Sequence, residues 1–336
     1  MGIQGWLSIM FLARNVQSSP RCSFFAFRSM SMMSPNWEDA SNKNDNVINK
    51  KSNFELTPVQ STSLLTAYWR YMESHQSVHQ PLIDDPTSKT LVDALLCQSL
   101  RADYDASPIR PYGIDCLAVR TRAMDDWLVA QKNSQPEESK EVQKRQLVNL
   151  GAGMCGRPYR MKDVPNIYQT WWEVDSDLDL LRTKRSVLSA AGYESRVPIH
   201  DLCIDLARQS LHDTLTAQPG FVSNDENIRT DWIAEGLFAY LEPHRHLSLL
   251  QETAFLSTKG SRMTVTVAEP AMMEFWGSFG AKIPHQVLVP VNDILTKARD
   301  ADWMVDQHIR PQEWSQRYPG RGEHLPGYHV LFLEKK

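Results

Sequence analysis

Residues 146–156, QLVNLGAGMCG, decide the fold of this chain. A short apolar strand, Gln146–Leu150, runs directly into Gly151, and further glycines follow at Gly153 and Gly156. Glycine permits both a tight turn and a close approach of the backbone to a ligand. A strand that ends in glycines and opens a helix therefore predicts a cradle for a nucleotide or cofactor. The spacing of the three glycines also satisfies the dinucleotide fingerprint G-x-G-x-x-G.

The next predicted strand supplies an acidic residue for such a cradle. It contains Tyr168 to Val174 (YQTWWEV) and ends at Asp175, with Glu173 two residues before. Either acid lies a little over twenty residues beyond Gly151, at a strand end where a carboxylate accepts protons from both ribose hydroxyls. The glycine loop and the acid together predict a bound nucleoside. The alternative is a tight junction between strand and helix, followed by a surface acid.

A long helical segment precedes the glycine strand. Helical periodicity begins after the cap-like residues 61–63 (STS), and further helices are predicted over 91–100 and 112–128. Dinucleotide-binding chains commonly begin with the glycine strand, whereas here residues 57–145 form a helical cap ahead of a sheet domain at 146–336. We therefore predict one α/β domain over 57–336. Its sheet is mostly parallel with helices on both faces, and the N-terminal cap covers its carboxyl edge.

The first 37 residues differ from the rest. They contain Arg14, Arg21 and Arg28, are rich in serine, and have no Asp or Glu, which is typical of an organelle transit peptide. The alternative is a disordered start ahead of an internal initiating methionine. Residues 38–56 are polar and asparagine-rich and predict a linker. The predicted location is cytoplasmic, or mitochondrial or plastid if residues 1–37 are a transit peptide.

The composition is that of a globular chain. The 336 residues are 42% apolar and 23% charged with a net charge of −4, which excludes collagen, coiled coil and wholesale disorder. The balance offers no broad positive field for a phosphate backbone, and no apolar run approaches the roughly 20 residues that cross a bilayer, so neither a nucleic-acid nor a membrane partner is predicted. Five cysteines without a Cys-x-x-Cys pair indicate a reducing compartment. The spacing of His75 and His79 is a weak signal, and no metal is predicted.

Five short sequence blocks occur in the same order as in a known protein family. They are PLIDDP at 81–86, AVRTRAMDDWL at 118–128, VNLGAGMCGRPYRM at 148–161, WEVD at 172–175 and IAEGLFAYLEP at 233–243. In these blocks the sequence resembles the leucine carboxyl methyltransferase family of S-adenosylmethionine-dependent methyltransferases, including its bacterial small-molecule O-methyltransferase relatives. The resemblance implies a Rossmann-like class I methyltransferase fold and S-adenosylmethionine (SAM) as cofactor.

The resemblance also implies a set of cofactor-binding residues. These are Arg120, Gly151, Ala152, Gly153, Asp175, Asp201, Leu202 and Glu235. Arg120, with Arg122 as the nearby alternative, would contact the methionine carboxylate. The glycine loop would approach the methionine moiety and the sulfonium, and Asp175 would take the ribose.

Residues at two further strand ends complete the implied pocket. Asp201-Leu202 is the best match to an Asp-Leu pair near the adenine, although Asp205-Leu206 is a competing registration. Glu235 lines the pocket at the end of the fourth strand.

The sequence departs from the family at two places. Cys155-Gly156 stand where the family commonly has Asp and a small hydroxylated residue. The lysine of the phosphatase-directed members has no convincing counterpart at 61–67, which favours a small-molecule or unassigned acceptor.

The acceptor decides whether a base is needed. Methyl transfer is an in-line displacement for which the protein mainly positions the nucleophile. An ionised carboxylate needs no general base, whereas a hydroxyl does. His200, Tyr240, His244 and His246 lie near strand ends and are candidate bases, but no catalytic residue is assigned.

The predicted function is thus a SAM-dependent O-methyltransferase acting on a carboxylate or hydroxyl of a small molecule or a protein C-terminus. One alternative is an NAD(P)-dependent oxidoreductase that uses the glycine loop. The other is a non-catalytic relative that binds the cofactor.

Overall fold

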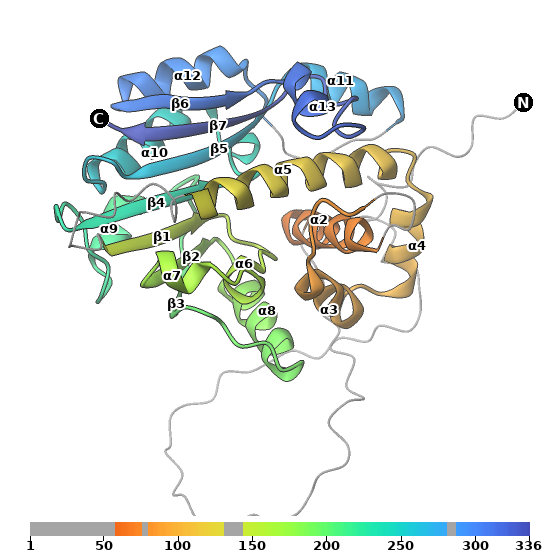
Figure 1. The fold of residues 1–336 in the computed structure, drawn as a ribbon, viewed down its shortest axis with the longest axis horizontal. Helices are drawn as coiled ribbons and strands as arrows, with labels where there is room; N and C mark the ends of the chain where they lie inside the picture. The colour runs from red at the N-terminus through yellow and green to blue at the C-terminus, as the bar shows by residue number, and fades with distance from the viewer. Residues whose placement is uncertain (1–57, 76–79, 131–143, 281–286) are drawn as a thin grey trace, which may run out of the picture.

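The computed structural model describes residues 58–75, 80–130, 144–280 and 287–336 (Figure 1). The predicted transit peptide at 1–37, the predicted linker at 38–56 and the predicted domain boundary at 57 lie outside these residues. His79 of the histidine pair also lies outside them.

Helices and strands alternate along most of the described chain. The strands are β1 (Lys144–Leu150), β2 (Thr170–Asp175), β3 (Ile199–Cys203), β4 (Ile228–Ala234), β5 (Arg262–Ala268), β6 (Trp303–Ile309) and β7 (Tyr328–Lys335). The helices before β1 are α2 (Pro58–Ser74), α3 (Pro86–Leu95), α4 (Gln98–Ala106) and α5 (Arg110–Ala130). The later helices are α6 (Arg157–Arg160), α7 (Val164–Ile167), α8 (Leu178–Ala190), α9 (Leu211–Thr216), η3 (Phe238–Tyr240), α10 (Pro243–Phe255), α11 (Pro270–Ser278), α12 (Val291–Asp300), η4 (Pro311–Glu313) and α13 (Trp314–Arg317).

The seven strands form one sheet in the order β3-β2-β1-β4-β5-β7-β6. Neighbouring strands from β3 to β5 are parallel, and β7 runs antiparallel to both β5 and β6. The chain leaves β1 toward β2 on one side and later returns to β4 on the other. This reversal places a topological switch point beyond the carboxyl ends of β1 and β4, where ligands bind in open α/β sheets.

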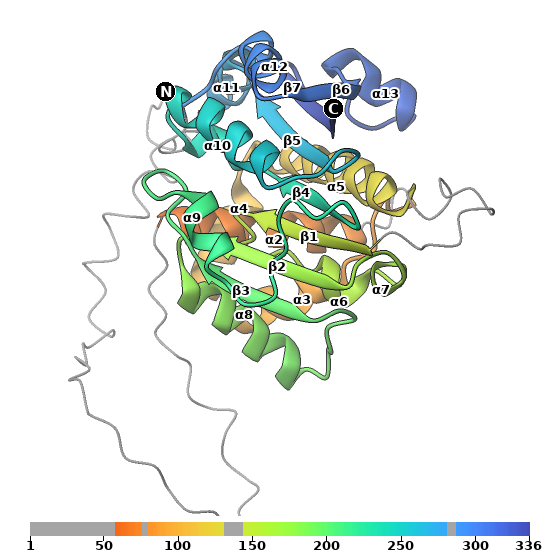
Figure 2. The same ribbon diagram turned by 90° about the vertical axis from the view of Figure 1, so that its left-hand side faces the viewer.

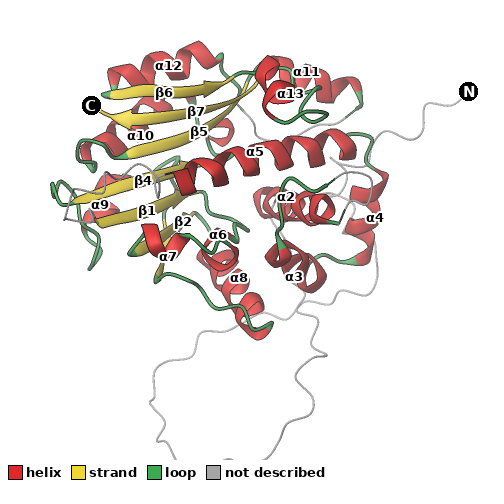
Figure 3. Cartoon of the chain, viewed as in Figure 1, coloured by secondary structure: helices red, strands yellow, loops and turns green. Residues whose placement is uncertain are grey.

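Helices cover both faces of the sheet (Figures 2 and 3). The core on one face joins the sheet to α2, α5 and α8, and the core on the other joins it to α9, α10 and α12. The consecutive Trp171 and Trp172 are both buried, one in each core, because successive strand side chains point to opposite faces. Burial of both faces explains why the parallel strands read as nearly continuous apolar runs.

The cap helices differ in detail from the sequence prediction. The helix predicted to begin after residues 61–63 starts at Pro58. The segment predicted as one helix at 91–100 is two helices, α3 and α4, because the backbone is extended at Leu96 (φ −89°, ψ 113°) and Cys97 (φ −70°, ψ 157°). Strand β6 was not predicted, since its run of four exposed residues shows no alternation.

The described ranges contain neither a membrane-spanning helix nor a metal-binding cluster. No helix there is both long and apolar enough to cross a membrane. The same ranges hold no group of three His, Cys, Asp or Glu side chains placed to bind a metal ion.

Candidate cofactor site

The glycine loop folds back onto the end of β2. Gly151 and Gly153 have φ values of +68° and +44°, a left-handed region that glycine adopts without steric cost. The amides of Gly151 and Ala152 both donate to the carbonyl of Val174, at 2.8 and 3.0 Å. The loop therefore lies directly against the strand end that carries Asp175.

Asp175 holds the loop with its side chain. Its Oδ2 accepts a hydrogen bond from the amide of Gly153 at 2.8 Å, and its Oδ1 accepts one from the amide of Asp177 at 3.2 Å. Burial raises the pKa of this carboxyl. A carboxylate at this position combines two properties that ribose recognition needs, namely acceptor oxygens at a strand end and a fixed place beside the glycines.

Arg120 and Glu235 meet on the other side of the loop. Arg120, from α5, donates from Nε to Glu235 Oε1 at 2.7 Å and from Nη1 to the hydroxyl of Tyr328 at 3.2 Å. Glu235 directly follows β4 and also accepts from Arg157 Nη1 at 2.5 Å. Burial opposes ionisation of Glu235, but the two guanidinium groups hold the pKa of its carboxyl well below the usual range.

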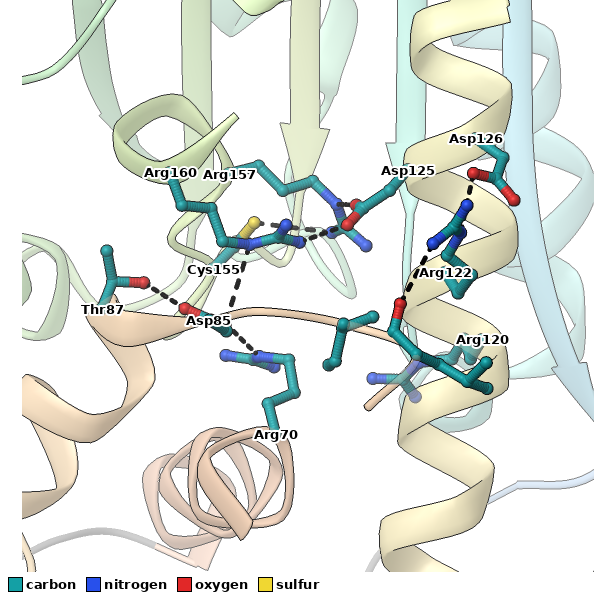
Figure 4. Close-up of polar contacts among 12 residues, drawn as sticks. Arg70, Asp85, Thr87, Arg120, Arg122, Asp125, Asp126, Cys155, Arg157 and Arg160 are labelled. Atoms are coloured by element: carbon teal, nitrogen blue, oxygen red, sulfur yellow. Dashed lines mark hydrogen bonds and ion pairs between the residues drawn. The ribbon is translucent and has the colours of Figure 1, made fainter. Parts of the chain in front are cut away.

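These residues belong to a larger buried group, here called the guanidinium cluster; Figure 4 labels its members other than Glu235. Its members are Arg70, Arg120, Arg157, Arg160, Asp85, Asp125 and Glu235. Asp125 pairs with Arg157 Nε at 2.7 Å and with Arg160 Nη2 at 2.6 Å. Asp85 pairs with Arg70 Nε at 3.0 Å, and Arg70 also donates to the carbonyl of Met154 at 2.8 Å.

The cluster joins three parts of the chain that are distant in sequence. It connects the cap helices α2, α3 and α5 to the glycine loop and to the end of β4. Four guanidinium groups face three carboxylates, so its formal charge is 4 − 3 = +1. A buried excess of positive charge at the edge of the site favours an anionic ligand group.

A family comparison agrees with this geometry. The model for the family described as leucine carboxyl methyltransferase matches residues 63–254, which is more than half of the chain. The chain belongs to the leucine carboxyl methyltransferase family. The matched residues include the cap, the glycine loop, Asp175 and Glu235.

Curated relatives are similar over part of their length. Each of the following three is named "Putative S-adenosyl-L-methionine-dependent methyltransferase". A protein of Mycolicibacterium gilvum is 33% identical over 54% of this chain and 58% of its own length. One of Mycolicibacterium vanbaalenii is 28% identical over 68% and 79%, and one of Mycobacteroides abscessus is 31% identical over 63% and 66%. The chain thus spans less than two thirds of the length of two of these three relatives.

Solved structures of methyltransferases are also similar. A magnesium protoporphyrin IX methyltransferase from Synechocystis, crystallised with S-adenosylhomocysteine (SAH), is 11% identical with a TM-score of 0.45, covering 83% of this chain and 98% of that one. A SAM-dependent methyltransferase from Leishmania major is 12% identical with a TM-score of 0.43, covering 84% and 88%.

These findings confirm several predictions made from the sequence. The family and the Rossmann-like α/β fold are as predicted, and the names of the relatives agree with the predicted class of SAM-dependent methyltransferases. The residues present fit that cofactor, because the glycine loop, the carboxylate of Asp175 and the buried Arg120 lie at one edge of the sheet.

A packing contact explains why the third position of the loop, Gly156, is a glycine. Gly156 has ordinary backbone angles (φ −106°, ψ 8°), but a Cβ there would lie 1.9 Å from Oγ1 of Thr87 on α3. The helix that follows has only four residues, whereas the dinucleotide fingerprint leads into a helix whose N-terminus holds a pyrophosphate. Contact with the cap therefore accounts for the spacing that suggested a dinucleotide.

The placement of Asp201-Leu202 at a strand end was wrong. Strand β3 continues to Cys203, and Asp201 lies in its middle, opposite Glu173 of β2. Its carboxylate pairs with Arg185 Nη2 at 2.6 Å, and Leu202 is buried in the core. The competing pair, Asp205-Leu206, lies beyond the strand end. It is separated from Cys203 by Ile204, whose amide donates to the carbonyl of Asp175.

Of the two candidate acids, Glu173 and Asp175, Glu173 lies away from the glycine loop. It is fully buried, and its Oε1 accepts from Lys184 Nζ at 2.8 Å. Lys184 is fully buried as well. Asp175 is therefore the acid that lies at the glycine loop.

The remaining candidates are placed as follows. Arg122 is exposed and pairs with Asp126 at 2.8 Å, so Arg120 is the arginine that faces the loop. Ala152 is buried within the loop. Sequence reasoning missed five members of the guanidinium cluster. One of them, Arg70, lies outside the family blocks and gave no signal. The other four could have been found from their position inside the blocks: Asp85, Asp125, Arg157 and Arg160.

The candidate bases are mostly engaged elsewhere. His246 is buried, its Nε2 is 2.8 Å from the carbonyl of Phe238, and burial lowers its pKa. His200 stacks on Trp172 with ring centroids 4.4 Å apart, and His244 is exposed on α10. Tyr240 follows β4 and its hydroxyl donates to Thr62 of α2 at 3.4 Å.

Proposed function

We propose that the chain is an SAM-dependent O-methyltransferase whose acceptor is a carboxylate. The observation that carries the proposal is the convergence of Gly153, Asp175 and the Arg120–Glu235 pair at the switch point of one sheet. Asp175 would hold the nucleoside, the glycines would allow it to approach the loop closely, and Arg120 would hold the amino-acid end. The bound cofactor supplies an electrophilic methyl group, and this chain's residues position and desolvate the acceptor.

A carboxylate acceptor is favoured over a hydroxyl by the charges around the loop. The guanidinium cluster carries a formal charge of +1 beside the site, which attracts an anionic acceptor. An acceptor that is ionised at neutral pH needs no base. This agrees with the engagement of His200 and His246 in packing contacts. A hydroxyl acceptor is the second candidate, since Tyr240 stands beside the cap at the same edge.

Calorimetric titration of the full chain tests the cofactor. SAM and SAH are expected to bind with micromolar dissociation constants, and reduced nicotinamide dinucleotides, as the matched control, are expected not to bind. Binding of the dinucleotides alone would overturn the proposal in favour of an oxidoreductase.

Turnover on a panel of acids and alcohols tests the acceptor. A methylated carboxylate is an ester that releases methanol in alkali, whereas a methylated hydroxyl is an alkali-stable ether. We expect radiolabelled product that becomes volatile after alkaline treatment. Alkali-stable label would show that the acceptor is a hydroxyl and not a carboxylate. Tight SAH binding without any turnover would indicate a non-catalytic relative.

A further inference from the structure

We infer that Tyr328 is a positioning residue of the cofactor site, whose hydroxyl fixes the guanidinium group of Arg120 for the amino-acid end of the cofactor. In the proposed function, on which this inference rests, Arg120 holds that end. Tyr328 lies beyond residue 254, where the match to the family ends. The contact therefore ties the cofactor site to a part of the chain outside the matched residues.

The topology of the sheet brings Tyr328 to the site. Strand β7 lies between β5 and β6 and runs antiparallel to both (Figure 1). Its first residue, Tyr328, therefore pairs with Ala268, the last residue of β5. The amino end of β7 thus lies at the same edge of the sheet as the carboxyl ends of the parallel strands, where ligands bind in open α/β sheets.

The hydroxyl of Tyr328 is one of two groups that hold Arg120. It accepts a hydrogen bond from Nη1 at 3.2 Å, and Glu235 accepts one from Nε at 2.7 Å. The third nitrogen, Nη2, makes no hydrogen bond to the residues that the structure describes. Because the guanidinium group is planar, bonds at Nε and Nη1 fix its plane and with it the place of Nη2. Nη2 is then the donor left for the carboxylate of a ligand.

The hydroxyl holds Arg120 without neutralising it. Glu235 shares its carboxylate between Arg120 and Arg157, so one negative charge faces two positive charges. Burial raises the pKa of Tyr328, although Arg120 opposes this shift, and the hydroxyl is neutral near pH 7. A second carboxylate in its place would cancel the charge that attracts an anionic ligand group, whereas a neutral acceptor preserves it.

The backbone of Tyr328 is itself held in place. Its carbonyl accepts a hydrogen bond from Nε1 of Trp314 at 3.0 Å, and its amide donates to the carbonyl of Leu325 at 3.2 Å. Trp314 is fully buried, and Tyr328 is 5% exposed. Packing and backbone hydrogen bonds thus lock the residue that orients Arg120, as the precise placement of a binding group requires.

Calorimetric titration of the full chain with two ligands tests this role. SAH carries the amino-acid end, whereas 5′-methylthioadenosine has the same nucleoside without it. Tyr328→Phe keeps the ring and the backbone contacts and removes the hydroxyl. We expect it to weaken SAH binding by about tenfold, the size of one hydrogen bond, and to change the affinity for 5′-methylthioadenosine by less than about twofold. Equal losses for both ligands, or an unchanged SAH affinity, would overturn the inference.

Tyr168→Phe is the matched control. Tyr168 lies two residues before β2, at the opposite edge of the sheet, and its buried hydroxyl donates to Asp231 Oδ2 at 2.8 Å. This variant also loses a buried hydrogen bond to a charged network, so we expect lower stability in urea unfolding but unchanged affinity for both ligands. A selective loss of SAH affinity in Tyr168→Phe as large as in Tyr328→Phe would show that the effect does not depend on Arg120.

A double-variant cycle tests whether Tyr328 acts through Arg120. Arg120→Lys keeps the charge but not the planar fork, and we expect the same selective loss of SAH affinity. Adding Tyr328→Phe to Arg120→Lys should then cost no further affinity, whereas additive losses would refute action through Arg120. If the unsubstituted chain binds neither ligand, the proposed function fails and this inference with it. Undiminished SAH binding by Tyr328→Phe refutes this inference alone.

Discussion

Alanine at Gly156 distinguishes a contact with the cap from a contact with a ligand. The added Cβ would lie 1.9 Å from Oγ1 and 2.9 Å from Cβ of Thr87, which is fully buried. Thr87 cannot rotate away freely, because its hydroxyl donates to Asp85 Oδ1 at 2.5 Å. Asp85 in turn accepts from Ser88 and pairs with Arg70. The substitution therefore strains the junction between α3 and the glycine loop.

The magnitude follows from three contributions. Overpacking costs about 1–3 kcal/mol, and losing the bond of Thr87 to a buried carboxylate costs about 1.5–3 kcal/mol. Alanine also restricts the unfolded chain more than glycine does, which offsets about 0.4–1 kcal/mol of the lost stability. We expect Gly156→Ala to lower the free energy of unfolding by about 2–5 kcal/mol.

Urea unfolding of the full chain, followed by tryptophan fluorescence, measures this loss. Thr87→Ala removes the clashing Oγ1, so the double variant Thr87→Ala/Gly156→Ala should be more stable than the sum of the single losses by about 1.5–3 kcal/mol. Gly277→Ala is the matched control. It adds a Cβ within α11 where nothing lies within 4 Å, and we expect it to be neutral or slightly stabilising.

Two results would refute this reasoning. Strictly additive losses would show that Thr87 and Gly156 do not share a contact. Unchanged stability of Gly156→Ala together with lost ligand binding would show that this glycine approaches a ligand, as the dinucleotide fingerprint suggests.

Three further predictions concern the site and the pH dependence. Asp175→Ala should weaken SAH binding by about 1–3 kcal/mol in calorimetry, since it removes charge-assisted acceptors, and unchanged affinity would exclude this residue from the ribose site. Asp205→Ala should weaken SAH binding more than Asp201→Ala, and the reverse order would restore the original registration. Burial lowers the pKa of His308 to about 4, so the unfolded chain takes up the proton first as the pH falls. Stability should be fully present above about pH 6.5 and fall by about 1 kcal/mol toward pH 4, allowing for solvent screening. A urea midpoint with the same pH dependence in His308→Phe would contradict the assignment.

The sequence predicted the parts of the site that depend on local pattern. The glycine loop after β1 and the acid after β2 are each read from one strand and the residues that follow it, and the structure joins them through the Gly153–Asp175 hydrogen bond. Arg120 and Glu235 came from the family resemblance, and they form a direct ion pair at 2.7 Å. The late strands β5 and β7 are also local in character, since both are rich in β-branched and apolar residues.

The sequence alone could not show where β3 ends relative to the two Asp-Leu pairs. Asp201-Leu202 and Asp205-Leu206 are equivalent as local patterns, and only pairing with β2 shows which one follows the strand end. Pairing also decides the face, because side chains alternate with a period of two. Asp201 thereby shares a face with Glu173 and pairs with Arg185 of α8.

The sequence by itself determined the class of protein and the glycine cradle, because a strand end, a glycine turn and an acid one strand later are short-range features. Tertiary structure decided which charges meet. The guanidinium cluster, the contact of Gly156 with Thr87 and the burial of Lys184 against Glu173 all join residues from different elements. Such contacts depend on how the cap docks onto the sheet, and on which side chains lose water there, which no local pattern encodes.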